Sequence, residues 1–229
     1  MKKNKITPYW RADYIIKKAI LDGIQTCSNY ITGIVLDIGC GNKPYEKLFT
    51  GAIKYFGLDI PVHYSANKED KKADIYCNLI RSLPIKNACI DGVIATEILE
   101  HMINPTFFLE ECSRIMKKDG CILITTPMTW EMHEIPFDYY RYTKFGLIKL
   151  LENSGFKIER IIPHSNSFLT VVQLYNLLIY NKFILNHPRF IRSVFSIIVF
   201  LISRISLFIF YNAKDAKLPL GYTVLAKKN

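Results

Sequence analysis

Short runs of β-branched and other apolar residues alternate with longer segments of mixed polarity along most of the chain. The runs predict seven strands, at residues 34–38, 54–59, 73–77, 91–95, 121–126, 156–162 and 220–227. The mixed segments predict helices at residues 12–30, 44–49, 105–117 and 143–153. Strands that alternate with helices are typical of a mostly parallel sheet, so we expect an α/β fold.

Two glycines mark expected helix ends. Gly155 follows Asn153 and Ser154 and suits a left-handed cap on the helix at 143–153. Gly120, after Lys118 and Asp119, is expected to close the helix at 105–117 in the same way.

The loops that follow the first four strands are the expected ligand site, because ligands bind at the carboxyl ends of parallel strands. The first loop lies in "VLDIGCGNKPY", residues 35–45. Gly39 and Gly41 let the backbone turn sharply and approach a ligand closely. A dinucleotide site needs a third glycine where this chain has Pro44, which argues against a nicotinamide cofactor. Asp37 suits a cationic group such as an amino acid ammonium.

Five segments, in order, resemble motifs of the class I S-adenosylmethionine-dependent methyltransferases. They are "VLDIGCG", "YFGLDI", "DIYCNLIRSLP", "IDGVIATEILEHMINP" and "RIMKKDGCILITTP". The resemblance runs from about residue 33 to 162 and resumes at 220. It implies a Rossmann-like, seven-stranded, mostly parallel sheet with S-adenosyl-L-methionine bound at its carboxyl edge.

The same resemblance implies a set of cofactor-binding residues. Asp59 matches an acid that accepts hydrogen bonds from both ribose hydroxyls, and Asn78 stands where an adenine-reading Asp is common. An Asn can still accept from the exocyclic amine through its carbonyl. Cys40 has no neighbouring base and reads as a small buried side chain. The full predicted set is Asp37, Gly39, Cys40, Gly41, Asp59, Ile60, Asn78, Leu79 and Thr96.

The segment "PMTWEMHEIPFDYYRYT", residues 127–143, follows strand five and resembles a stretch of methyltransferases like those of bacterial surface-glycan gene clusters. His133 is predicted to be the catalytic base for a hydroxyl, because its unperturbed pKa is near neutrality. Asp138, Tyr139 and Arg141 are predicted substrate contacts. Alternatively, Asp138 and Arg141 form an internal pair that holds the loop over packed tyrosines.

The motif "EILEH" places Glu97, Glu100 and His101 near the end of strand four. With His133 these side chains can bind a divalent cation, which some methyltransferases with a similar motif use to position vicinal hydroxyls. Alternatively, Glu100 and His101 only begin the next helix and support the cofactor loop. Most methyltransferases that resemble this motif need no metal, so we predict none.

About fifty residues separate the last two strands, where a hairpin is normal for this fold. We therefore predict a methyltransferase domain at residues 1–163 and 218–229 and a hydrophobic helical insertion at 164–217. On a helical wheel, the polar residues of 190–211 fall within an arc of ~160°. They are Arg192, Ser193, Ser196, Ser203, Arg204 and Ser206, opposite Val194, Ile198, Leu201, Ile205 and Ile209.

The uncharged run from Ser193 to Ser203 is shorter than the ~20 apolar residues of a membrane span. We therefore expect this segment to lie in a membrane interface rather than to cross the membrane. A lid or a dimer contact buried by protein is the alternative.

The formal net charge is +10, with lysines clustered at 2–5, 68–72, 117–118 and 227–228. No basic helix is interleaved with aromatic residues, so we favour an anionic membrane or substrate over nucleic acid. Six cysteines without C-x-x-C spacing indicate a reducing cytoplasm. The N-terminal "MKKNKITPYW" does not read as a secretory signal.

Together these features predict a cytoplasmic S-adenosylmethionine-dependent methyltransferase, peripheral on the inner face of the cell membrane. Its expected acceptor is an oxygen of a glycan or lipid-linked glycan. A quinone or another lipid is the alternative acceptor, and a non-catalytic S-adenosylmethionine-binding membrane scaffold is the alternative outside the enzyme class. The sequence gives no indication of the oligomeric state.

Overall fold

The computed structural model describes residues 12–61, 72–184 and 187–229. Within them, seven strands form one sheet in the order β3-β2-β1-β4-β5-β7-β6. The strands are β1 Gly33–Ile38, β2 Ala52–Asp59, β3 Ile75–Tyr76, β4 Ile90–Thr96, β5 Met116–Pro127, β6 Phe156–Pro163 and β7 Gly221–Lys228. This sheet confirms the predicted Rossmann-like fold class.

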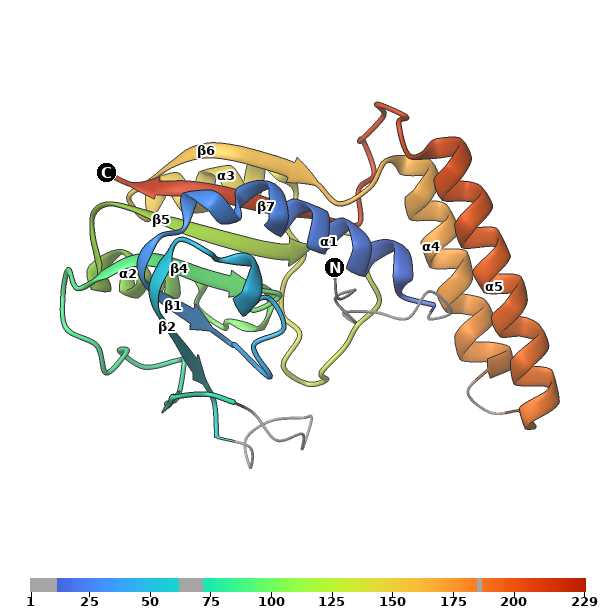
Figure 1. The fold of residues 1–229 in the computed structure, drawn as a ribbon, viewed down its shortest axis with the longest axis horizontal. Helices are drawn as coiled ribbons and strands as arrows, with labels where there is room; N and C mark the ends of the chain where they lie inside the picture. The colour runs from blue at the N-terminus through green and yellow to red at the C-terminus, as the bar shows by residue number, and fades with distance from the viewer. Residues whose placement is uncertain (1–11, 62–71, 185–186) are drawn as a thin grey trace. The chain divides into compact units, whose positions relative to one another are not determined.

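The central strands of the sheet are parallel. β1 pairs with β2 on one side and with β4 on the other, β2 continues to β3, and β4 continues to β5. Figure 1 shows β7 running in the opposite direction to β5 and β6. The chain order reverses between β1 and β4, so the carboxyl ends of these two strands border the crevice where such sheets bind ligands.

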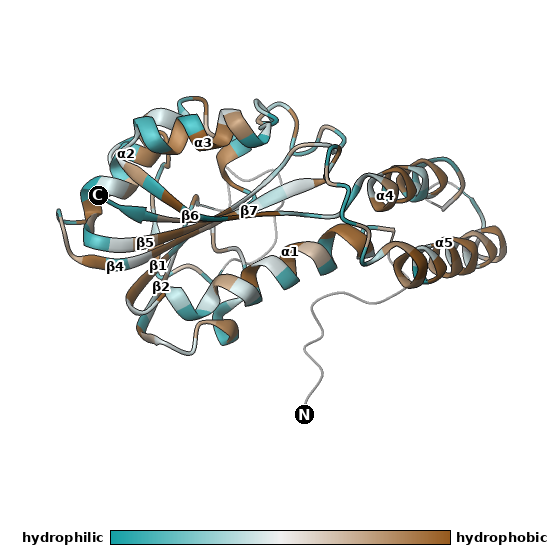
Figure 2. Cartoon of the chain, turned by 90° about the horizontal axis from the view of Figure 1, so that it is seen from above, coloured by the Kyte–Doolittle hydropathy of each residue, from teal (hydrophilic) through white to brown (hydrophobic). Residues whose placement is uncertain are grey.

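Helices cover both faces of the sheet. α2 (Pro105–Ile115) and α3 (Lys144–Asn153) lie on one face, and α1 (Tyr14–Cys27) lies on the other (Figure 2). The side chain of Asn104 caps α2 by accepting a hydrogen bond of 3.0 Å from the amide of Phe107. Thr143 caps α3 in the same way. The helices begin where polar caps precede their apolar stripes.

The core lies between the sheet and the helices. Its fully buried side chains include Val93, Ile122 and Ile124 of the sheet and Phe108, Leu109 and Leu147 of α2 and α3. On the opposite face, a Cβ added at Gly23 would lie 2.2 Å from Oγ1 of Thr223, so α1 approaches β7 closely there. This packing fixes the strand ends that carry the site.

Some predicted elements differ from the observed ones. The helix expected at 44–49 is only a short 3₁₀ turn, η2 (Glu46–Leu48), and β3 has two residues. The turn at Lys118-Asp119-Gly120 does not cap α2, which ends at Ile115. It lies in β5, where the pairing with β4 shifts register and Asp119 has a φ of 64°. Gly155, with a φ of +85°, confirms the predicted left-handed end of α3.

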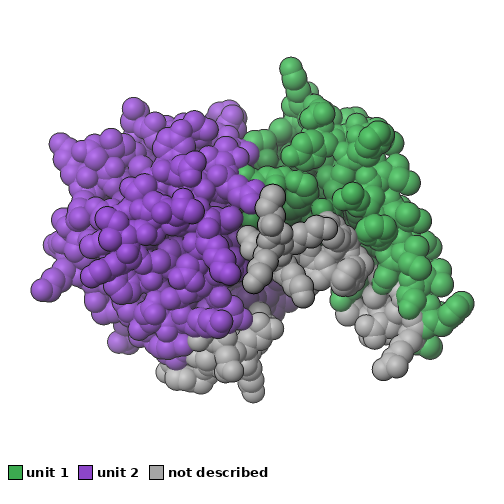
Figure 3. All heavy atoms as spheres, viewed as in Figure 1, with its two compact units in different colours: residues 1–22, 163–221 green, residues 23–162, 222–229 purple. Residues whose placement is uncertain are grey.

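The described chain divides into two compact units, coloured separately in Figure 3. One comprises residues 23–162 and 222–229 and contains most of the sheet. The other comprises residues 12–22 and 163–221, with α4 (Ser167–Ile179), the π-helix η5 (Tyr180–Ile184) and α5 (Arg189–Phe210). The predicted insertion at 164–217 falls within this second unit, while the assignment of each unit to a separate role stays a prediction.

Three sequence interpretations concern residues outside the described part of the chain. They are the reading of the N-terminal decapeptide, the lysine cluster at 2–5 and most of the cluster at 68–72.

Candidate active site

The glycine turn after β1 has the conformation that its sequence predicts. Gly39 and Gly41 have φ values of +71° and +49°, in the left-handed region. The amide of Gly39 donates a hydrogen bond of 2.8 Å to the carbonyl of Leu58. A Cβ added at Gly39 would lie 2.0 Å from Cδ1 of Ile98, whereas one added at Gly41 would meet no described atom within 4 Å. Gly39 is therefore required for packing, while no described atom occupies the space beside Gly41.

Asp59, at the end of β2, fixes this turn. Its carboxylate is buried and accepts hydrogen bonds from the amides of Gly41, at 2.9 Å, and Ile60, at 2.7 Å. A carboxylate offers about four lone-pair positions. Contact of this carboxylate with a ligand hydroxyl stays a prediction.

Asp37, at the end of β1, is buried with one oxygen engaged. Oδ2 accepts a hydrogen bond of 2.7 Å from the hydroxyl of Tyr55, while Oδ1 has no hydrogen-bond partner among the described residues. Burial raises the pKa of Asp37 to about 7. Tyr55 was not predicted, although strand alternation contains the signal: Asp37 pairs with Gly57, and Tyr55 lies two residues earlier on the same face.

The remaining predicted cofactor residues lie on neighbouring loops. Asn78 follows β3, and its Oδ1 accepts a hydrogen bond of 3.0 Å from the amide of Ile80. The Leu79 side chain belongs to the core, so only its backbone is free to face a ligand. Thr96 ends β4. Cys40 is buried, and burial raises the pKa of its thiol to about 12, in keeping with a packing role.

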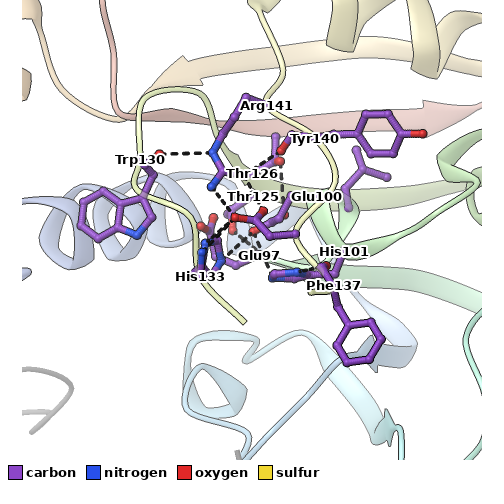
Figure 4. Close-up of polar contacts among 12 residues, drawn as sticks. Glu97, Glu100, His101, Thr125, Thr126, Trp130, His133, Phe137, Tyr140 and Arg141 are labelled. Carbon is purple, nitrogen blue, oxygen red and sulfur yellow. Dashed lines mark hydrogen bonds and ion pairs between the residues drawn. The ribbon is translucent and has the colours of Figure 1, made fainter. Parts of the chain in front are cut away.

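A second group of polar side chains follows β4 and β5 (Figure 4). Glu100 is fully buried in the turn η4 (Leu99–His101), and its Oε2 accepts a hydrogen bond of 3.3 Å from the hydroxyl of Thr126. Its Oε1 lies 3.8 Å from Nε2 of His101 and 3.9 Å from Nε2 of His133. One ligand atom of each residue lies within 4.8 Å of the others. We call these three residues the Glu100–His101–His133 cluster.

The surroundings of both histidines determine which ring nitrogen carries the proton. Nδ1 of His101 lies 2.7 Å from the carbonyl oxygen of Phe137, which can only accept, so this nitrogen is the donor. Nδ1 of His133 lies 3.4 Å from both the Glu131 carbonyl and Oδ2 of Asp138, which are also acceptors. Burial lowers the pKa of His133. In the neutral form of either ring, the lone pair is therefore on Nε2, the nitrogen nearest to Glu100.

Glu97 adds a second carboxylate to this region. It adopts a φ of 52°, and its amide donates to the carbonyl and hydroxyl of Thr125, at 2.9 and 3.1 Å. Burial raises the pKa of Glu97 to about 7. The pKa of Glu100 is raised well above its ordinary range, first by burial and then by the charge of Glu97. Like Oε1 of Glu100, Oε1 of Glu97 has no hydrogen-bond partner in the described chain.

The loop after β5 is held by an internal ion pair. Arg141 binds Asp138 through two contacts, at 2.6 and 2.7 Å, and also donates to the carbonyl of Glu131 at 2.9 Å. Oδ2 of Asp138 in turn accepts a hydrogen bond of 2.9 Å from the amide of His133. Arg141 is the main cause of the lowered pKa of Asp138, about 2. The structure thus has the internal pair of the alternative interpretation, and contact of Asp138 or Arg141 with an acceptor stays a prediction.

Tyrosines join this loop to η4. The hydroxyl of Tyr142 donates to the carbonyl of Leu99 at 3.1 Å, and the hydroxyl of Tyr140 donates to that of Ile103 at 3.0 Å. The amide of Tyr139 donates to the carbonyl of Glu100 at 3.0 Å. Tyr142 is buried, but Tyr139 and Tyr140 are 40% and 39% exposed, so only Tyr142 packs beneath the loop. The predicted substrate contact of Tyr139 stays a prediction.

The comparisons with known sequences agree on the central region. Residues 36–124 match the family model described as a methyltransferase domain. A probable S-adenosylmethionine-dependent methyltransferase from Mycolicibacterium smegmatis is 28% identical over 55% of this chain and 52% of its own length. The mitochondrial ubiquinone biosynthesis O-methyltransferase from Rattus norvegicus is 29% identical over 40% of this chain and 30% of its own length. The chain thus matches about half or less of each of these relatives.

Solved structures share the fold at low identity. A SAM-dependent methyltransferase from Archaeoglobus fulgidus superposes with a TM-score of 0.57 at 20% identity, over 93% of this chain and 94% of its own. The [4+2]-cyclase SpnF also has a TM-score of 0.57, at 18% identity, over 91% of this chain and 80% of its own. The names differ although the fold is shared, so fold alone does not determine the reaction.

Proposed function

We propose that this chain, in which residues 36–124 match a methyltransferase domain, transfers a methyl group from S-adenosylmethionine to an oxygen of a glycan or lipid-linked glycan. The observation that carries this proposal is the placement of three carboxylate oxygens that have no hydrogen-bond partner among the residues the structure describes. Oδ1 of Asp37, Oε1 of Glu97 and Oε1 of Glu100 are buried at the carboxyl ends of β1 and β4. Buried carboxylates are costly unless a cation or donor engages them, so these ends suit cationic or hydroxyl-bearing ligands.

The residues after β1 and β2 fit S-adenosylmethionine. Oδ1 of Asp37 is available to the amino acid ammonium, and the open side of Gly41 leaves room for the ligand. The carboxylate of Asp59, at the end of β2, would accept from the ribose hydroxyls, and the loop with Asn78 and Leu79 would face the adenine. When bound, the cofactor supplies a methyl group already activated by a sulfonium.

His133 is the proposed proton acceptor. Its pKa is lowered by burial, so the neutral ring is favoured near pH 7, and Nε2 carries the lone pair. Asp138 holds the His133 backbone and lies beside Nδ1, which makes Asp138 a positioning residue. The work of the protein is then to align the acceptor and to remove its proton late in the transfer.

The Glu100–His101–His133 cluster also supports a second mechanism. Two imidazole lone pairs and an unpartnered carboxylate oxygen converge within 4.8 Å, and the Nδ1 of each histidine is engaged by an acceptor. Such outer contacts orient metal-ligating histidines. A divalent cation bound here, with Glu97 nearby, would position acceptor oxygens and lower the pKa of a hydroxyl. His133 cannot use the same lone pair as ligand and base, so chelation distinguishes the two mechanisms.

The proposed class of methyl acceptor is supported by sequence resemblance and by the apolar helices. The resemblance of residues 127–143 to methyltransferases like those of surface-glycan gene clusters favours a glycan, and the apolar helical unit favours an acceptor held at the inner face of the cell membrane. The similarity to ubiquinone biosynthesis O-methyltransferases favours a quinone or another lipid as the second candidate. A binding scaffold without turnover is the candidate outside the enzyme class.

Labelling distinguishes these candidates. Purified protein is incubated with methyl-labelled S-adenosylmethionine and a bacterial membrane extract, and the labelled product is separated and identified. Label in a saccharide-containing product supports the glycan proposal, and label in a saccharide-free lipid supports the second candidate. Absence of label from protein that binds S-adenosylhomocysteine supports the scaffold.

A further inference from the structure

The two long helices after β6 expose many large apolar side chains and bury several polar ones. α4 and α5 run antiparallel and contact each other (Figure 1), and both are strongly hydrophobic (Figure 2). On α4, Phe168, Val171, Tyr175 and Leu178 are each more than half exposed. Their spacing of three and four residues places them on one helix face. α4 therefore presents an apolar stripe outward.

α5 has the same arrangement over a greater length. Its outward apolar side chains are Val194, Ile197, Ile198, Leu201, Ile205, Phe208 and Ile209, with exposed fractions of 38–91%. The stretch Ser193–Phe210 has a mean hydropathy of 2.3, and only 17% of it is buried within the structure. By length and composition, this stretch is sufficient to cross a membrane.

The interior of this unit contains polar side chains beside the buried apolar residues Leu169, Leu177, Ile179 and Val199. Nδ2 of Asn176 donates a hydrogen bond of 2.8 Å to Oγ of Ser203, which donates in turn to the carbonyl of Val199 at 2.8 Å. Gln173 is bonded to the backbone of Ala12 and Ile16, and Asn176, Gln173 and Ser203 are at most 1% exposed. A helix pair surrounded by water normally buries its apolar stripe and exposes its polar one. Here Asn176 and Ser203 bond to each other between the helices while large apolar side chains face outward, an arrangement typical of helices that face lipid.

We propose that the α4–α5 hairpin docks on an anionic lipid bilayer, with its outward apolar side chains buried in the membrane interface. Charge complementarity selects this occupant, because residues 163–214 contain no Asp or Glu. The basic residues of the same stretch are Lys182, Arg189, Arg192, Arg204 and Lys214. Anionic headgroups attract such residues near a bilayer. The role of this docking, to bring the active site to a membrane-held acceptor, rests on the proposed function. The docking itself does not require methyl transfer.

The same charges argue against a second copy of the chain as the occupant. A symmetric contact through this face would bring two acid-free, basic surfaces together with no opposite charge to pair. They also favour lying in the interface over crossing it. Arg204 is exposed midway along α5, and a crossing hairpin would carry Lys182, near the turn, through the hydrocarbon.

Vesicle flotation tests this proposal. The full chain is mixed with phosphatidylcholine vesicles with or without phosphatidylglycerol, and the floated fraction is measured. The triple variant Leu201→Asp, Ile205→Asp, Phe208→Asp removes the apolar face, and Ile53→Asp with Phe145→Asp, 83% and 76% exposed in the other unit, is the matched control. We expect wild type and control to float with anionic vesicles and the triple variant to lose at least about 100-fold in partitioning.

Further readouts separate the possible failures. Circular dichroism and calorimetry with S-adenosylhomocysteine report whether the triple variant is folded and binds cofactor. A single Leu201→Ser substitution, expected to weaken flotation by about tenfold, provides a milder test if the triple variant is unfolded. Wild-type protein that stays with the soluble fraction, or sediments as an oligomer that the triple variant dissociates, would overturn the docking proposal in favour of a protein partner or a second copy. Normal flotation without methyl transfer would leave docking intact and remove only the proposed function.

Discussion

The amide of Gly41 donates a hydrogen bond of 2.9 Å to Oδ2 of Asp59, which joins the loop after β1 to the end of β2. The bond holds the backbone of Gly41 in a left-handed conformation with open space on its outer side. A single carboxylate thus shapes one wall of the proposed cofactor site.

Replacing Asp59 tests its predicted contact with the ligand. Asp59→Ala removes charge-assisted hydrogen bonds to the ligand worth about 1.5–3 kcal/mol, and we expect S-adenosylhomocysteine to bind about 10- to 150-fold more weakly. Asp119→Ala removes an exposed carboxylate paired with Lys227 and serves as control. Isothermal titration calorimetry measures both variants. Unchanged affinity of Asp59→Ala would exclude this residue from the cofactor site.

Asp37 predicts a pH dependence of cofactor binding. Its pKa is raised to about 7 in the free protein, chiefly by burial. An ammonium beside the carboxylate would lower that pKa, so binding at pH 7 should release about half a proton. Below pH 7 the carboxyl group must first ionise, and affinity should fall by up to about tenfold per pH unit.

Calorimetry in buffers of different ionisation enthalpy measures this proton release. Asp37→Asn keeps an oxygen that can accept from the Tyr55 hydroxyl but cannot ionise. The variant should bind weakly and release no proton. An equal proton release from wild type and Asp37→Asn would show that another group titrates.

His133→Ala should lower the rate of methyl transfer by about 10²–10⁴-fold with cofactor affinity nearly unchanged, if Nε2 accepts the proton. Asp138→Asn keeps an acceptor oxygen for the His133 amide but removes the charge beside Nδ1. It should lower the pKa of His133 and shift the acid limb of the pH–rate profile to lower pH, because the carboxylate stabilises the imidazolium. A His133→Ala variant with wild-type turnover would end this assignment.

The cation mechanism predicts a different set of results. Direct titration of metal-free protein with Mn²⁺ should give one binding site, and Glu100→Gln and His101→Ala should each abolish it. Glu131→Gln, a change outside the cluster, should leave it intact. Chelation should then stop methyl transfer without displacing S-adenosylhomocysteine. Full activity after chelation, with no Mn²⁺ binding, would leave His133 as a plain base.

The fold was predictable because short apolar runs form strands and polar caps begin helices, and these local preferences agree with the final packing. Asn104 and Gly155 mark helix ends in the sequence and do so in the structure. The prediction that Lys118-Asp119-Gly120 closes the preceding helix was wrong, because a turn signal does not specify which element the turn belongs to. Here the turn forms within β5, where the pairing with β4 shifts register.

The relative placement of the candidate site residues was predictable where position in a motif determines position in space. Asp37, Gly41 and Asp59 meet because consecutive parallel strands end at one edge of the sheet. The partnership of Asp37 with Tyr55 depends on side-chain directions that the motifs do not state. The exposure of the apolar face of α5 could not be predicted either. A helical wheel separates a polar face from an apolar face but does not show which one is buried.

The most direct test of the account is methyl transfer itself, compared between wild type and Gly41→Val. The variant places a side chain in the open space beside Gly41, where the cofactor is proposed to lie, and should therefore bind and transfer nothing. Purified wild type, given methyl-labelled S-adenosylmethionine and membrane extract, should transfer label to an acceptor in the extract, while folded Gly41→Val should not. Equal labelling by both proteins would contradict the account. So would a wild type that binds S-adenosylhomocysteine but transfers no label, either with a chelator or with added metal.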